Sequence, residues 1–276
     1  MNPKILLRTR ASLGEGPVWD PKMERLLWVD IEGGKLHITT NVEGEVSDQV
    51  LVAPEMVSSI GLTESSFLVS ARQSLYRYDG SFKELGSIKD VPQVRFNDGK
   101  CGPDGNFWVG TMDLGEKDEI GKLYVFNGRF KVIVDKLIIS NGLDWFRDVF
   151  YLVDSPKKRV YAFRVKGEEL ESLGVAVETW DYPGVPDGMT VDLSGNLWIA
   201  HYGGGIITKW EPFSRKPILE VKMPVKIVTS LTFGGKDLDK IFVTSSSRAG
   251  EELGGSLFVL ETDEKGREPH LCKEWI

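Results

Sequence analysis

Long apolar runs are missing from this sequence of 276 residues, and no stretch approaches the roughly 20 apolar residues that a membrane helix requires. The opening stretch, MNPKILLRTR, has too short an apolar run for a secretory signal. Basic runs are missing as well, and the net charge is −7, which argues against nucleic acid as a partner. These absences predict a globular protein of the cytoplasm that binds neither membranes nor nucleic acid.

Cysteine and helical periodicity are also scarce. The two cysteines, Cys101 and Cys272, are too few for a disulfide framework and do not have the spacing of a zinc site. We expect both to be buried thiols, with a single long-range disulfide as the less favoured alternative. No long segment repeats its apolar residues with the period of an amphipathic helix, which argues against a helical fold.

What the sequence does contain is a repeat of short apolar strings: LWVD (27–30), FLVS (67–70), FWVG (107–110), FYLV (150–153), LWIA (197–200) and IFVT (241–244). They begin 40 to 47 residues apart, and each is followed by a second string rich in β-branched and aromatic residues, such as KLYVF (122–126). Strand-only units of this period predict an all-β, six-bladed β-propeller with a central channel. We expect one domain over residues 1–276, with KILLRT (4–9) as a candidate strand for closing the ring.

Polar residues precede each string at two different distances along the sequence. The nearer ones are expected in a hairpin turn, and the farther ones at the start of the innermost strand, beside the channel. Each string is expected to be the second strand of its blade, so GPDGN (102–106) is a hairpin turn, whereas RFNDG (95–99) begins the innermost strand. At this earlier register a polar side chain recurs in all six units: Glu15, Ser58, Ser59, Arg95, Asn97, Asn141, Asp187, Thr229 and Ser230. Because innermost strands surround the channel, we expect these side chains to converge at one mouth.

Three of these residues suit a metal ion. Glu15, Asn141 and Asp187 offer only oxygen ligands, two of them charged, which favours a divalent ion such as Ca²⁺, Mg²⁺ or Mn²⁺. The three histidines lie outside this register, so a dedicated zinc site is less favoured. The alternative is that these side chains only hydrogen-bond strand ends and order water. Their shared register in three blades favours the metal site.

Arg95 and Asn97 are two residues apart on one strand, so both should face the channel while Asp98 points away. Near a metal ion, Arg95 could orient the oxygen atoms of a ligand. A salt bridge from Arg95 to Asp98 or to a loop carboxylate is an equally good alternative.

Two loops are longer than their counterparts in the other units, residues 113–120 and 245–254. Longer loops on a rigid scaffold are often functional, although neutral surface insertions are an equally good explanation. His201 and Tyr202 follow another string. They could lie at the channel mouth, but an ordinary loop is the favoured expectation.

Seven motifs run through essentially the whole chain: GEGPVWD (14–20), RFNDGK (95–100), GTMD (110–113), SNGLDW (140–145), PDGM (186–189), LWIA (197–200) and FGG (233–235). In these motifs and their order the chain resembles the regucalcin/gluconolactonase family, also called the senescence marker protein family. The resemblance implies a six-bladed propeller with one divalent metal ion near the channel mouth. Members of that family hydrolyse sugar lactones to aldonic acids, and others hydrolyse related esters.

Matched motif by motif, the resemblance implies metal ligands at Glu15, Asn141 and Asp187 and substrate contacts at Arg95 and Asn97. It also implies that Asp187 is the general base. One departure concerns a glutamate that similar animal proteins carry a few residues after GTM, where this chain has Gly115 and then Glu116. Either Glu116 makes the substrate contact instead, or the contact is absent.

These features together predict a metal-dependent hydrolase that opens sugar lactones by polarisation of the carbonyl and attack of water, with Asp187 as the base. Calcium is the first expectation for the ion, with zinc, magnesium or manganese as alternatives. Competing predictions are a non-enzymatic calcium-binding or interaction propeller and a metal-dependent esterase or phosphotriesterase. The physiological lactone, the native metal and the oligomeric state are left open.

Overall fold

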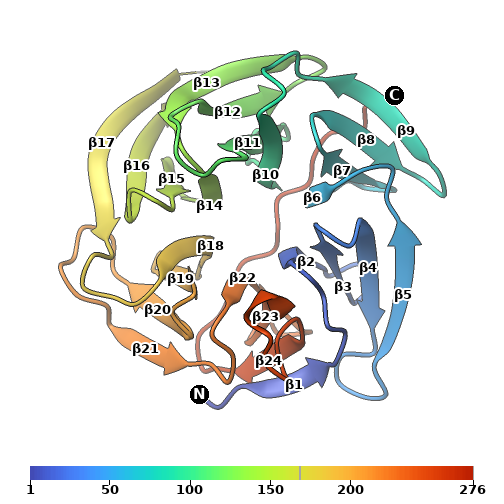
Figure 1. Ribbon diagram of the computed structural model, residues 1–276, viewed down its shortest axis with the longest axis vertical. Helices are drawn as coiled ribbons and strands as arrows, with labels where there is room; N and C mark the ends of the chain where they lie inside the picture. Colours follow the sequence, from blue (N-terminus) through green and yellow to red (C-terminus); the bar gives the residue numbers. More distant parts are fainter. Residues whose placement is uncertain (168, 276) are drawn as a thin grey trace.

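The computed structural model describes residues 1–167 and 169–275 of the chain. Within these residues, 24 strands form six four-stranded sheets around a common centre, like the blades of a propeller (Figure 1). The prediction of an all-β, six-bladed propeller is therefore confirmed. The one helical element of the described residues is a 3₁₀ turn, η1 (Ser247–Ala249), and no helix is long and apolar enough to cross a membrane.

Five blades follow the chain from the innermost strand to the outermost. Blade one contains β2 (Gly14–Asp20), β3 (Arg25–Asp30), β4 (Lys35–Thr40) and β5 (Ser47–Val52). Blade two contains β6 (Val57–Leu62), β7 (Phe67–Ala71), β8 (Ser74–Tyr78) and β9 (Phe82–Ser87). Blade three contains β10 (Val94–Cys101), β11 (Phe107–Asp113), β12 (Gly121–Phe126) and β13 (Phe130–Leu137). Blade four contains β14 (Ser140–Phe146), β15 (Val149–Asp154), β16 (Arg159–Lys166) and β17 (Glu169–Glu178). Blade five contains β18 (Val185–Val191), β19 (Leu197–Tyr202), β20 (Ile206–Trp210) and β21 (Leu219–Lys222).

Blade six is built from both ends of the chain. It contains β22 (Val228–Gly234), β23 (Lys240–Ser245) and β24 (Leu257–Glu261), and its outer edge is β1 (Lys4–Leu7). β1 pairs antiparallel with β24, with Lys4 opposite Val259. The candidate closing strand in residues 4–9 therefore does close the ring.

The apolar core lies between neighbouring blades rather than within one of them. Val29 and Ile38 of blade one, for example, share a buried cluster with Ile60 and Val69 of blade two. Each blade packs both of its faces against neighbours, so strings such as FWVG are apolar at consecutive positions and every residue of β11 is buried.

The turn before each string is the hairpin turn that the register predicts. In blade three, Asp104 accepts a hydrogen bond of 3.2 Å from Nε1 of Trp108, the tryptophan of the following string. Gly105 adopts a φ of 74°, a left-handed value that glycine accepts without strain. In blade five, Asp192 likewise accepts a hydrogen bond of 3.0 Å from Nε1 of Trp198, the tryptophan of that blade's string. Asp98 lies inside the innermost strand β10 instead, as expected.

After β24, a C-terminal segment (residues 262–275) runs past the centre of the ring (Figure 1). Residues 267–270 of this segment line a cavity in the channel together with the innermost strands. Arg267 forms a 3.0 Å ion pair with Asp144 of blade four, and the backbone N–H of Lys273 donates to Gly105 of blade three at 2.8 Å. The segment therefore closes one end of the channel.

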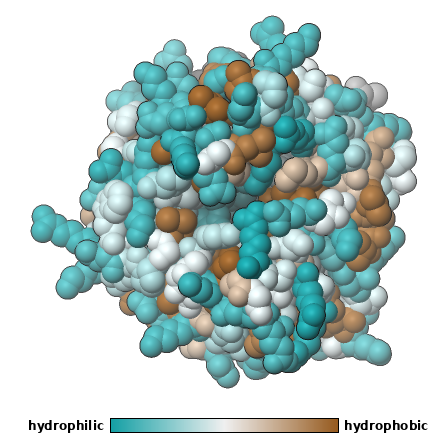
Figure 2. All heavy atoms as spheres, in the orientation of Figure 1, coloured by the Kyte–Doolittle hydropathy of each residue, from teal (hydrophilic) through white to brown (hydrophobic). Residues whose placement is uncertain are grey.

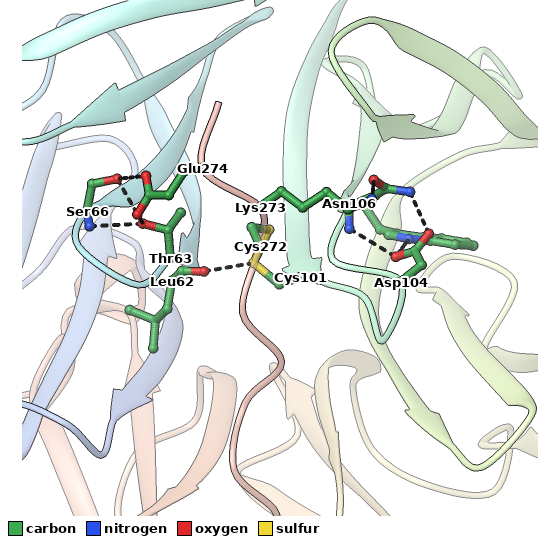
Figure 3. Close-up of a disulfide and its surroundings, with 10 residues drawn as sticks. Leu62, Thr63, Ser66, Cys101, Asp104, Asn106, Cys272, Lys273 and Glu274 are labelled. Carbon is green, nitrogen blue, oxygen red and sulfur yellow. Dashed lines mark hydrogen bonds between the residues drawn. A yellow bond between two sulfur atoms is a disulfide. The ribbon is translucent and has the colours of Figure 1, made fainter. Parts of the chain in front are cut away.

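The two cysteines form a disulfide between β10 and the C-terminal segment (Figure 3). The expectation of two thiols was therefore wrong. The path of the C-terminal segment brings the Cα atoms of Cys101 and Cys272 within 5.1 Å although 171 positions separate them in sequence. The backbone N–H of Cys272 also donates to the carbonyl of Leu62 at 2.7 Å, which ties the segment to blade two as well.

Candidate functional site

A cavity opens at the channel mouth where the innermost strands begin. It is lined by all six residues that the sequence assigns to a site: Glu15, Arg95, Asn97, Glu116, Asn141 and Asp187. The cavity encloses about 510 Å³ including its open mouth. In the space-filling view the ring is hollowed near its centre, and most side chains around the hollow are hydrophilic (Figure 2).

A bulge in each innermost strand directs these residues toward the channel. The pairing between the first two strands shifts register at the same place in all six blades, for example between Ser140 and Leu143 of β14 and between Pro186 and Met189 of β18. Bulges interrupt the alternation of a strand and re-aim side chains. Asn141 and Asp187 both lie inside such an interruption.

Glycines next to the site residues let neighbouring innermost strands approach each other. A Cβ added to Gly142, which follows Asn141, would lie 2.4 Å from the backbone nitrogen of Met189 in the next blade. A Cβ added to Gly188, which follows Asp187, would lie 2.0 Å from Oγ of Ser230. The recurring glycine of the sequence motifs is therefore explained by close packing between blades.

The two candidate carboxylate ligands are buried and repel one another. Burial, followed by repulsion from Asp187, raises the pKa of Glu15 well above its usual value. Burial and repulsion from Asp98 do the same to the pKa of Asp187. A cation between the two carboxylates would remove this cost, so their arrangement suits one electrostatically.

The third candidate ligand, Asn141, is oriented by a chain of hydrogen bonds. Nη1 of Arg95 donates to Oδ1 of Asn97 at 2.9 Å, and Nδ2 of Asn97 donates to Oδ1 of Asn141 at 3.2 Å. Nδ2 of Asn141 in turn donates to Oγ of Ser155 at 3.0 Å. Because Oδ1 of Asn141 accepts only the hydrogen bond from Asn97 within the described residues, it keeps a second lone pair for another partner.

The donor set therefore fits a hard divalent ion. No three His, Cys, Asp or Glu side chains are grouped to hold a metal ion in the described part of the chain. The candidate site depends instead on the amide oxygen of Asn141 beside two carboxylates. Calcium takes roughly six to eight oxygen ligands, so such a site would keep positions for water or substrate.

Arg95 makes no ion pair with Asp98 within the described residues. Its Nη1 donates instead to the carbonyl of Phe96 at 2.8 Å as well as to Asn97. Burial lowers the pKa of Arg95 to about 10, which leaves the guanidinium charged at neutral pH. The side chain is thus held beside the candidate ligands, and its Nε and Nη2 groups make none of these hydrogen bonds.

Asp98 lies on a different cavity, as the alternation of the strand predicts. It lines the deeper part of the channel together with Lys100, where residues 267–270 of the C-terminal segment close the space. Burial raises the pKa of Asp98 to about 6, while Lys100 and Arg95 act against this shift. Asp98 therefore adds negative potential near the site without lining its mouth.

The polar residues of blades two and six do not reach the mouth cavity. Oγ atoms of Ser58 and Ser59 lie 2.8 and 2.6 Å from Oγ of Ser70, and Thr229 donates to the carbonyl of Gly14 at 2.6 Å. In these two blades the hydroxyl groups satisfy strand ends, which was the alternative to a ligand site.

Neither His201 nor Tyr202 is in an ordinary loop, so that expectation was wrong for both, because β19 includes them. β19 continues through Tyr202, which pairs with Val185, and the side chain lines the mouth cavity. His201 is buried instead, with Nε2 2.8 Å from Oγ1 of Thr208.

Arg248 also lines the mouth cavity, and the sequence identified only its loop. The two long loops, residues 113–120 and 245–254, each bring one charged side chain to the cavity, Glu116 and Arg248. Unusual loop length therefore indicated two segments that reach the cavity, although it did not indicate which residue of each does so.

Comparison with known proteins gives one consistent result. The sequence profile of the SMP-30/Gluconolactonase/LRE-like region matches residues 13–247. The chain is 31% identical to the pentonolactonase XacC of Haloferax volcanii, with 94% of each sequence covered. It is 35% identical to regucalcin of Gallus gallus, covering 86% of this chain and 84% of that one. The solved structure of a calcium-binding protein, regucalcin, from Agrobacterium tumefaciens matches with a TM-score of 0.91 at 25% identity, covering 99% and 98% of the two chains.

Proposed function

The chain belongs to the SMP-30/gluconolactonase/LRE-like family, and from this premise we propose that it hydrolyses sugar lactones in the mouth cavity. One observation carries the proposal: two carboxylates, two amides and a guanidinium from four blades line a single cavity. The similarity to a pentonolactonase supports a sugar lactone as the substrate class. The reaction adds water to the lactone carbonyl and breaks the ring C–O bond, which yields an aldonic acid.

A divalent ion is part of this proposal, with Ca²⁺ as the first choice and Mg²⁺, Mn²⁺ or Zn²⁺ as alternatives. Glu15, Asn141 and Asp187 would hold it, because they bring oxygen ligands from three blades to one cavity. When bound, the ion would supply Lewis acidity toward the lactone carbonyl. The similarity to a calcium-binding protein supports this choice of ion.

The protein's own side chains would position the reactants. Asp187 would orient the attacking water and take its proton. Arg95 and Asn97 would hold the sugar hydroxyls, since both line the cavity and have polar atoms available for a ligand. Glu116 would accept a hydrogen bond from a further hydroxyl.

The test is proton release from glucono-1,5-lactone, followed with a pH indicator against a no-enzyme control, because this lactone also opens uncatalysed. We expect EDTA to abolish the enzymatic rate and added Ca²⁺ to restore it. Asp187→Asn should reduce kcat by about a hundredfold or more, as the loss of a general base does. Asp181→Asn, an exposed carboxylate outside the cavity, is the matched control. Full activity in Asp187→Asn would rule out this assignment.

A second candidate function is calcium binding without catalysis, which the calcium-binding regucalcin structure favours. In that case calorimetry would detect Ca²⁺ binding that Glu15→Gln weakens, while no lactone would be opened faster than in the control. A panel of simple esters and phosphotriesters in the same assay separates the third alternative, a metal-dependent esterase or phosphotriesterase.

A further inference from the structure

Three residues at the mouth form what we call the arginine clamp: Arg248, Glu32 and Tyr202. They come from the long loop of blade six, the β3–β4 turn of blade one and the end of β19 in blade five. The loop that carries Arg248 is itself anchored, because the backbone N–H of Ser247 donates to the carbonyl of Ala11 at 3.0 Å. The clamp therefore connects three blades at the edge of the cavity.

The contacts of the clamp fix the plane of the guanidinium. Nε and Nη2 of Arg248 bind the two oxygens of Glu32 at 3.3 and 2.5 Å, and Nη1 donates to the hydroxyl of Tyr202 at 3.0 Å. Such a two-point contact defines orientation as well as distance. The side chains of Arg248 and Glu32 are 39% and 38% exposed, so the ion pair contributes little to folding stability. Its main effect is to hold the guanidinium in one position.

The clamp leaves Arg248 with unused donors at the cavity. A guanidinium has five N–H groups, and the three contacts leave one on each terminal nitrogen. Arg248 lines the cavity, so these donors are available to a ligand there. The hydrogen bond from Arg248 lowers the pKa of Glu32, so the carboxylate is charged and compensates the cation. A neutral oxygen such as a hydroxyl therefore suits this position better than an anion.

Acceptors and donors face the same space. Arg95, Glu116 and Arg248 all line the mouth cavity. The side chain of Glu116 forms no hydrogen bond or ion pair with any described residue, so its oxygens are free to accept. A sugar hydroxyl both donates and accepts, and this mouth offers it partners of each kind.

We propose that Arg248 determines specificity, donating hydrogen bonds to hydroxyl groups of the bound sugar lactone from a position fixed by Glu32 and Tyr202. The proposal rests on the proposed function for the nature of the substrate. It assigns to the long loop of blade six the selection of hydroxylated lactones over plain ones.

The first experiment compares two lactones with the same six-membered ring, glucono-1,5-lactone and the unsubstituted δ-valerolactone. We expect Arg248→Ala to lower kcat/KM for glucono-1,5-lactone about tenfold, the equivalent of one hydrogen bond to a charged group. The value for δ-valerolactone should change less than about twofold, because that substrate has no hydroxyl to lose. Arg248→Lys should recover part of the loss, since lysine keeps a charged donor but not the planar fork.

The matched control is Arg8→Ala. Arg8 pairs with Glu252 of the same long loop at 3.3 Å, but both side chains are largely exposed and neither lines the cavity. This variant should leave both lactones unaffected. Equal losses for the two lactones in Arg248→Ala, or no loss for either, would overturn the proposal.

The second experiment separates this inference from the proposed function. 1,5-Anhydro-D-glucitol has the hydroxylated ring but no carbonyl, so it binds without reacting. Calorimetry should show weaker binding to Arg248→Ala than to the unmodified protein by about tenfold. If no lactone is hydrolysed yet this difference is present, the proposed function fails and the role of Arg248 stands. Equal affinities would refute the role of Arg248 whatever the hydrolysis assay shows.

Discussion

At the scale of single residues, Glu116 is notable for its backbone as well as its position. Its φ is 58°, in the left-handed region that residues other than glycine seldom occupy. The loop accepts this conformation because Asp113 receives hydrogen bonds from the backbone N–H groups of Gly115, Lys117 and Asp118. Such conformations persist where the surroundings enforce them and are common at functional sites.

Glu116→Gln should therefore weaken lactone binding more than catalysis. We expect KM for glucono-1,5-lactone to rise several-fold to about tenfold with kcat nearly unchanged, because a charged acceptor is replaced by a neutral one. Steady-state kinetics measure both values. Asp118→Asn, in the same loop but outside the cavity, is the control. A fall in kcat with unchanged KM would contradict a binding role.

Five of the six candidate residues could be predicted from the repeat because they share one register, whereas Glu116 was assigned only through the family resemblance. That they line one cavity agrees with the prediction, while their roles as ligands and contacts stay predictions. Arg248 could not be assigned from the sequence, because its loop is unique to blade six and offers no register. Tyr202 was misplaced because it lies beyond its four-residue string, whereas strand pairing continues through it.

At the scale of elements, the innermost strands depend on close contact at their glycines. The repeat of the sequence predicts where these strands begin, and the strings predict their partners. The bulges could not be predicted in the same way, because the repeat gives the position of each strand and not the register of its pairing. The close contacts between blades could not be predicted either. Gly142 shows this, since its neighbour is the backbone of Met189 in β18.

Gly142→Ala tests this close approach. An added Cβ would lie 2.4 Å from the nitrogen of Met189, so blades four and five must shift apart. We expect a loss of about 1–3 kcal/mol in the free energy of unfolding, typical of overpacking, together with weaker Ca²⁺ binding. Guanidinium denaturation and calorimetry measure these quantities. Gly44→Ala, where nothing lies within 4 Å, should change neither. Identical denaturation midpoints for the two variants would show that the contact is unimportant.

At the scale of the whole molecule, the disulfide and β1 hold the ring together at different points. The hydrophobic strings predict the blades, but the C-terminal segment lies outside the repeat, so neither its path nor the pairing of Cys101 with Cys272 could be derived from periodicity. That residues 1–276 form one cooperative domain stays a prediction.

Cys272→Ser should destabilise the fold. A cross-link between residues 171 apart restricts the unfolded chain by about 5 kcal/mol in the loop-entropy description, and the loss should approach that value. Guanidinium denaturation of both proteins, with and without reductant, gives the measurement. Reductant should weaken the unmodified protein and leave Cys272→Ser unchanged. A single transition in each case would support one domain, whereas unchanged stability in the variant would show that the disulfide contributes nothing.

The pairing of β1 with β24 also determines when the ring can close during synthesis of the chain. A ribosome makes Lys4 before blades one to five and Val259 after them, yet the two lie opposite each other in blade six. The first strand must therefore remain without its partner while blades one to five are being synthesised. The ring can be completed only after β24 has emerged, so the mouth cavity cannot take its final shape before blade six has been made.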